Sequence, residues 1–126
     1  MSQASSVISA FVSALSRQDR AAARELIADG APMKFPGGAI FTDVGSFIEW
    51  ASSRYRTADY RYDSMEELSV GGDTVVYARG VIDGELNDGA VFSGVRVVDR
   101  FKIRDGKIVE KEAWSDMADY LRRQGL

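Results

Sequence analysis

The sequence predicts an α+β fold, in which a strongly curved antiparallel sheet wraps around N-terminal helices and encloses a pocket. Two observations lead to this prediction. Apolar residues recur at helical spacing in the first part of the chain, and from about residue 58 they alternate with polar residues as in strands. Helices and strands that are segregated along a chain are typical of α+β proteins. With 126 residues and no repeat or linker, the chain is expected to form one domain over residues 1–126.

The N-terminal segment is expected to form two helices. Val7, Phe11 and Leu15 are spaced i, i+4, i+8, which is typical of a helix with one buried face. Asp19 is a suitable N-cap for a second, shorter helix that ends at Gly30, since glycine is the usual residue after a helix C-terminus.

An extended segment and a third helix follow. Pro32 and Pro36 bracket the extended segment, because the residue before a proline avoids the helical region. Thr42 or Asp43 can cap the third helix. The apolar residues expected on that helix are Phe47, Ile48, Trp50, Ala51 and Tyr55. A strand is predicted to begin near Ala58.

The next strand, around residues 74–82, has apolar residues on both faces. We expect Val75, Tyr77 and Arg79 to point inward, and Val76 and Ile82 to lie on the outer face. Under this assignment Arg79 brings a guanidinium group toward the pocket.

Residues 95–116 carry the clearest strand pattern. Apolar residues alternate with basic ones from Val95 to Ile103, and Asp105-Gly106 then forms a two-residue hairpin turn. Asp99 is the exception, since it places a carboxylate in the middle of the face that should be buried. It is therefore the first candidate for a functional residue.

The last strand allows two orientations, which the apolar content does not distinguish. One points Lys111 inward and the other points Glu112 inward, and a β-bulge would allow a mixture. The alternative inward sets are Val109, Lys111, Ala113 and Ser115, or Ile108, Glu110, Glu112 and Trp114. Asp116, with an acidic residue three positions later, predicts a short final helix with a capping box.

Composition excludes several kinds of chemistry. The chain has no cysteine and no histidine, so thiolate nucleophiles, Ser-His-Asp triads and the usual zinc sites are absent, and we expect no metal and no cofactor. The net charge of −3 gives no reason to expect nucleic acid, and Arg54, Arg56 and Arg61 are interpreted as a solvated surface. No apolar run is long enough to span a membrane and no signal peptide is visible, so a cytoplasmic location is expected.

The order of elements resembles a known superfamily. A helical N-terminal third is followed by strands that end in V-x-x-D-R-F-K-I-R-D-G-K-I-V-E, with W-S-D after them. This pattern resembles the nuclear transport factor 2-like superfamily, and within it the SnoaL-like proteins, which include polyketide cyclases. The resemblance implies a cystatin-like cone with a pocket for a small, mostly apolar ligand, and a homodimer formed through the outer sheet face. It also favours the orientation with Lys111 inside.

The catalytic residues of the steroid isomerases in this superfamily are incomplete here. Their inward carboxylic acid matches Asp99. Their first-helix tyrosine is replaced by Phe11, and their carboxylate base falls at Lys34 or Phe35.

The epoxide hydrolases of the superfamily are matched no better. They use an arginine between two aspartates, and Arg79 falls at the arginine. The aspartates fall at Val81 and Ala113. The resemblance therefore leaves open whether the protein is an enzyme.

Asp99 and Arg79 are the two candidates for catalysis or for contact with a ligand oxygen. Enclosed among apolar groups, Asp99 would donate a hydrogen bond to a ligand, and Arg79 would bind a carboxylate or enolate. The alternative is that each forms a structural ion pair. The residues expected to line the ligand site are Phe11, Phe35, Trp50, Tyr77, Phe101, Lys111 and Ala113.

Two functions remain in view at this point. The first is binding of a small, mostly hydrophobic ligand that carries an oxygen, with or without acid-base turnover of the isomerase, cyclase or dehydratase type. The second is a non-catalytic dimeric module that binds a partner protein and has a filled pocket. A cavity of about 300 Å³ or more that is lined by Asp99 would favour the first, and a filled interior with a large apolar sheet surface would favour the second.

Overall fold

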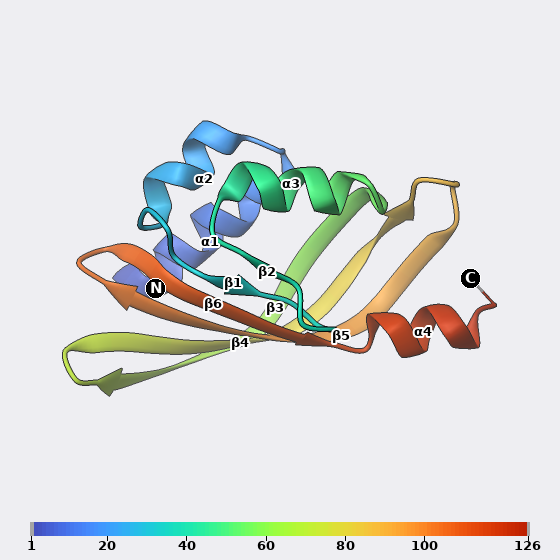
Figure 1. Cartoon of the computed structure of the whole chain (residues 1–126). Helices are drawn as coiled ribbons and strands as arrows, with labels where there is room; N and C mark the ends of the chain where they lie inside the picture. The colour runs from blue at the N-terminus through green and yellow to red at the C-terminus, as the bar shows by residue number, and fades with distance from the viewer. Residues whose placement is uncertain (1, 126) are drawn as a thin grey trace.

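The computed structural model describes residues 2–125, which form four helices and a six-stranded sheet (Figure 1). In chain order the elements are α1 (Gln3–Ser16), α2 (Arg20–Leu26), β1 (Met33–Lys34), β2 (Ile40–Phe41), α3 (Val44–Ser52), β3 (Tyr55–Val70), β4 (Asp73–Leu86), β5 (Val91–Arg104), β6 (Lys107–Ser115) and α4 (Met117–Arg123). The predicted α+β fold is therefore confirmed.

Side-chain caps start the N-terminal helices. The Asp19 carboxylate accepts a hydrogen bond from the backbone N–H of Ala22, and Asp43 accepts one from that of Ser46 at 3.0 Å. This bond lowers the pKa of Asp43. Both predicted caps are thus present, and Asp43 is the one that fixes the start of α3.

Two predicted helix ends are wrong. α2 ends at Leu26 and not at Gly30, because Ile27 forms a parallel bridge to Ile108 of β6. Tyr55 belongs to β3 and not to α3, since the helix closes at Ser53. In both places pairing with the sheet overrides the local apolar spacing.

The strand order is β2-β1-β6-β5-β4-β3, and the pairs are antiparallel except for β1 with β6. Asp105 and Gly106 join β5 to β6 with positive φ angles of 51° and 76°, as the predicted two-residue turn requires. The register shifts at several points along β3, β4 and β5, and such bulges bend a sheet.

The curved sheet and the helices enclose the core. Figure 1 shows α1, α2 and α3 together over one face of the sheet, while α4 lies beyond the end of β6. Ile8 and Phe11 of α1 are fully buried, as are Val76 and Phe101 of the sheet. The predicted cone is therefore formed by the helices and the concave sheet face.

The start of α4 differs from the prediction in one detail. The Asp116 side chain makes no cap and instead pairs with Arg96, with 2.5 Å between Oδ2 and Nε. The Ser115 hydroxyl accepts a hydrogen bond from the backbone N–H of Met117. No helix among residues 2–125 is long and apolar enough to cross a membrane.

Candidate functional site

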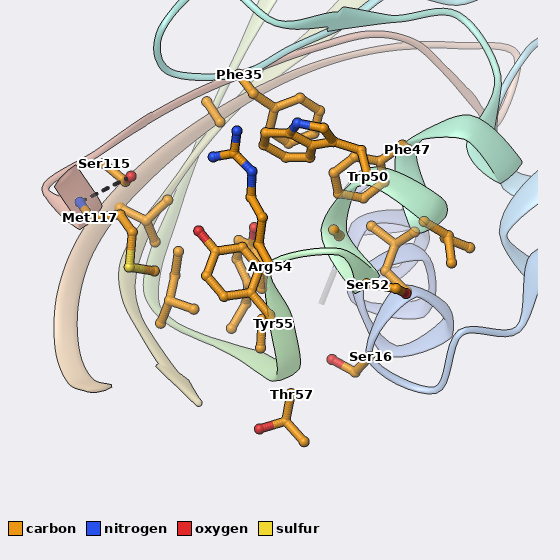
Figure 2. Close-up of a pocket in the computed structure, with 18 of the residues that line it drawn as sticks. Ser16, Phe35, Phe47, Trp50, Ser52, Arg54, Tyr55, Thr57, Ser115 and Met117 are labelled. Atoms are coloured by element: carbon orange, nitrogen blue, oxygen red, sulfur yellow. Dashed lines mark hydrogen bonds between the residues drawn. The ribbon is translucent and has the colours of Figure 1, made fainter. Parts of the chain in front are cut away.

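A pocket of about 290 Å³ opens between the sheet, α3 and α4 (Figure 2). Its walls come from the end of α1, the segment before β2, α3, the first half of β3 and the N-terminal part of α4. Val97 of β5 and Ala113 of β6 line it from the sheet. The volume lies just below the roughly 300–1,000 Å³ that small-molecule sites occupy.

One wall of the pocket is aromatic. Phe47 and Trp50 are three residues apart on α3 and therefore project from the same side of the helix. The ring of Phe35 stacks on that of Phe47, with centroids 4.5 Å apart, and lies 5.7 Å from that of Trp50. Figure 2 shows the three rings side by side at the pocket. They supply an apolar surface suited to a ring or chain of a ligand.

Two tyrosines supply polar groups to this apolar pocket. Burial raises the pKa of Tyr60 and of Tyr55, so that both hydroxyls stay protonated at neutral pH. Among residues 2–125, the tyrosine hydroxyls that take part in hydrogen bonds are those of Tyr62 and Tyr120. The hydroxyls of Tyr60 and Tyr55 are therefore free to donate to a ligand.

Asp99 is fully buried in a network of its own. The Tyr62 hydroxyl donates a hydrogen bond to its Oδ2, and the Lys111 ammonium lies 3.6 Å from its Oδ1. Burial and the neighbouring Asp99 carboxylate raise the pKa of Tyr62 well above its usual value. The Lys111 Nζ also lies 4.5 Å from the centroid of Phe35, which favours a cation by its ring quadrupole.

The residues that the sequence predicts for the site divide into three groups, of which the third, Tyr77 and Arg79, lies on the outer face of the sheet. Phe35, Trp50 and Ala113 line the pocket. Four other predicted site residues do not line the pocket and are fully or almost fully buried in the core: Phe11, Asp99, Phe101 and Lys111. Phe35 borders both the pocket and the buried ion pair. Asp99 is thus adjacent to the pocket walls but does not reach the pocket.

The predicted inward orientation of Arg79 and Tyr77 is wrong. Strand pairing sets Ala78 opposite Asp99, so Ala78 shares the buried face and its two neighbours point outward. Arg79 pairs with Glu66 on the surface at 3.0 Å, and Tyr77 is 37% exposed.

The residues of β4 that the sequence assigns to the outer face are likewise on the opposite face. Val76 and Ile82, which the sequence assigns to the outside, are 0% and 5% exposed and belong to the core. Both faces of β4 carry apolar side chains, so the alternation of residues alone could not show which face points into the core.

The open question about the last strand is answered by a bulge. Lys102 pairs with Glu110 and the next residue, Ile103, pairs with Ile108, so Val109 is the extra residue. Both Ile108 and Lys111 are consequently buried.

Four residues at or beside the site were not recognised as such from the sequence. Arg54 and Arg56, both interpreted as solvated surface residues, line the pocket. The Cζ of Arg54 lies 4.4 Å from the Trp50 ring centroid. Tyr60 and Tyr62 show strand alternation, but no sequence signal indicates that one lines the pocket and the other binds Asp99. Their roles depend on the register of β3, which the sequence does not give.

The sequence matches a known family. A family model described as the SnoaL-like domain matches residues 8–111. The chain belongs to this family. No curated protein is similar enough to this SnoaL-like protein to count as a match.

Solved structures give the same fold for this SnoaL-like protein. A nuclear transport factor 2-like protein of unknown function from Burkholderia pseudomallei has a TM-score of 0.75 at 17% identity, with 97% of each chain covered. IdmH, a putative polyketide cyclase from Streptomyces antibioticus, has a TM-score of 0.70 at 20% identity, over 97% of this chain and 98% of that one. TerC, co-crystallised with polyporic acid, has a TM-score of 0.73 at 15% identity, over 96% and 97%. At these identities the similarity establishes the fold and no activity.

Acidic side chains do not gather into a metal site. Among residues 2–125 no group of three or more Asp or Glu side chains is close enough together to hold a metal ion. The groups that the pocket lining offers to a ligand are aromatic rings, hydroxyls and guanidinium groups.

Proposed function

We propose that this SnoaL-like protein binds a small, mostly apolar molecule that carries an oxygen, in the pocket between α3, α4 and the sheet. The observation that carries the proposal is an apolar cavity of about 290 Å³ that is lined by Tyr60 and Tyr55, whose hydroxyls make no hydrogen bond with any other residue in the range 2–125. Small-molecule sites typically combine such an apolar lining with a few polar groups that fix orientation. A phenol that remains protonated donates readily to a carbonyl, lactone or carboxylate oxygen.

Binding is favoured over acid-base turnover by the residues that line the pocket. Among residues 2–125, none of the lining residues is Asp or Glu, and the chain has no histidine. Asp99, which the sequence suggested as the acid, is already engaged by Tyr62 and Lys111. A ligand in the pocket therefore meets hydrogen-bond donors, and no ordinary general base.

The proposal is tested with a panel of small ketones, lactones and carboxylates, by ligand-induced shifts in melting temperature and by calorimetry. Ala118 of α4 lines the pocket and is exposed, so Ala118→Trp adds a large side chain that fills the pocket. Ala21→Trp adds the same side chain on an exposed position of α2 outside the pocket. We expect wild type and Ala21→Trp to bind the same compounds and Ala118→Trp to lose them. Equal binding by Ala118→Trp, or no binding by the wild type, would show the proposal to be wrong.

A further inference from the structure

The charged residues that line the pocket are Arg54 and Arg56, so the lining carries positive charge and, among residues 2–125, no carboxylate. The two arginines differ in their partners. Arg56 is neutralised by Glu85, with 2.5 Å between Nη1 and Oε1, and also donates to the carbonyl of Asn87. Arg54 forms no ion pair within 4.0 Å and no side-chain hydrogen bond with any other residue in the range 2–125. Arg54 is thus the cation at the pocket that still has its donors available.

Arg54 is held in a defined place even without a carboxylate. It follows α3 directly, and its backbone N–H donates to the carbonyl of Ala51. Its Cζ lies 4.4 Å from the ring centroid of Trp50, a contact that stabilises a cation by the ring quadrupole. Figure 2 shows the Arg54 side chain extending along the pocket toward the rings of Trp50 and Phe35. The guanidinium edge remains free to form hydrogen bonds.

We propose that Arg54 binds the anionic group of the ligand, and that the ligand is an apolar carboxylic acid bound as its carboxylate. This inference rests on the proposed function and specifies the class of ligand. The aromatic wall of Phe35, Phe47 and Trp50 receives the apolar part, and the Arg54 guanidinium receives the carboxylate. A planar guanidinium matches a carboxylate with two parallel hydrogen bonds, which is the strongest common pairing for such a group.

Lys111, a third cation near the pocket, is also unsuited to this role. The Lys111 ammonium is fully enclosed, lies 3.6 Å from Asp99 and lies outside the pocket lining. A ligand anion there would have to displace a buried carboxylate partner. Arg54, at the pocket wall, can bind an anion that keeps part of its contact with water, which lowers the cost of desolvation.

The test compares two probes of nearly equal shape, naphthalene-2-carboxylate and naphthalene-2-carboxamide, by calorimetry and by quenching of tryptophan fluorescence. We expect the wild type to bind the acid about tenfold more tightly than the amide, since charge-assisted hydrogen bonds are about twice as strong as neutral ones. Arg54→Gln should remove this preference while leaving the affinity for the amide within about twofold. Added salt should reduce the preference in the wild type, because the guanidinium is exposed.

Arg79→Gln is the matched control, since it removes one positive charge from the outer sheet face. It should keep the preference for the acid. The inference is overturned if the wild type binds both probes equally, or if Arg54→Gln retains the preference. In both cases the proposed function stands, because the pocket still binds an apolar ligand. If neither probe binds and Ala118→Trp changes nothing in the wider panel, the proposed function fails together with the inference.

Discussion

Asp99 and Lys111 bury opposite charges in the centre of the fold. Their side chains are 0% and 2% exposed, and the 3.6 Å between Nζ and Oδ1 is longer than a hydrogen bond. The carboxylate is supported by the Tyr62 hydroxyl, and the ammonium by the rings of Phe35 and Phe101. Each charge is tolerated because of the other, since an isolated buried charge is costly.

We therefore predict that the effects of substituting these two residues on the unfolding free energy are strongly coupled. Asp99→Asn keeps an acceptor for Tyr62 but leaves the Lys111 ammonium without its counter-charge, and should cost about 3–5 kcal/mol of unfolding free energy. Lys111→Met should cost a similar amount. The double variant should cost much less than the sum of the two, because both charges are gone. Urea unfolding of the four proteins measures the coupling.

The exposed pair Arg79–Glu66 provides the control cycle, with side chains 60% and 65% exposed. Its coupling should be no more than about 1 kcal/mol. Additive effects of the Asp99 and Lys111 variants would contradict the prediction.

At the scale of elements, the sequence predicts a helix or strand boundary correctly where a capping or turn residue at that boundary marks it. Asp19, Asp43 and the Asp105-Gly106 turn are local signals, and the elements they start or join are present. Helix ends and the inner face of β4 depend on pairing with distant strands. Arg79 was therefore assigned to the wrong face, although the strand itself was predicted correctly.

The same reason explains the limits at the site. Trp50 and Phe35 were found because their apolar character predicts burial whatever the register. Tyr60 and Arg54 were missed because their positions are set by the bulged register of β3 and by the turn after α3. Asp99 was correctly predicted to be buried, but its separation from the pocket depends on Tyr62 and Lys111, which are distant in the sequence.

Gly80 controls how closely β3 and β4 approach beside Tyr62. A Cβ atom at this position would lie 1.9 Å from the backbone oxygen of Arg61. We predict that Gly80→Ala destabilises the protein by about 1–3 kcal/mol, because one of the two backbones must move. The variant should also weaken ligand binding, since the displaced segment positions Tyr60 at the pocket.

Gly45→Ala is the control for this substitution. Its Cβ would lie 2.9 Å from the flexible end of Arg24 and 3.0 Å from the side-chain Oδ2 of Asp43, with no backbone atom among the three nearest, and alanine is a better helix former than glycine. We expect a change of less than about 1 kcal/mol for Gly45→Ala in the same denaturation experiment. A Gly80→Ala protein as stable as the wild type would contradict the prediction.

At the scale of the whole molecule, the sheet has two unlike faces. The concave face is covered by α1, α2 and α3, while the described helices leave the other face open, and Trp114 is 48% exposed there (Figure 1). Val98 pairs with Trp114 across β5 and β6, so these two apolar groups are adjacent on this face, and Tyr77 lies on the same side opposite Arg100. Exposed apolar patches of this kind mark association surfaces.

We predict that two copies of the protein associate through this face, and that Trp114→Lys shifts the dimer to monomer. The lysine removes the largest apolar group of the patch and sets two like charges near each other across a two-fold interface. Light scattering coupled to size exclusion, over a wide range of concentrations, measures the mass.

Ile40→Lys is the control, since Ile40 is 59% exposed on β2, at the edge of the sheet. It should leave the dimer intact. A wild type that remains monomeric at the highest concentration, or an Ile40→Lys variant that dissociates as readily as Trp114→Lys, would rule out this interface. Because the pocket is lined by the opposite side of the sheet and by α3 and α4, Trp114→Lys should still bind ligand, which separates loss of the dimer from loss of the fold.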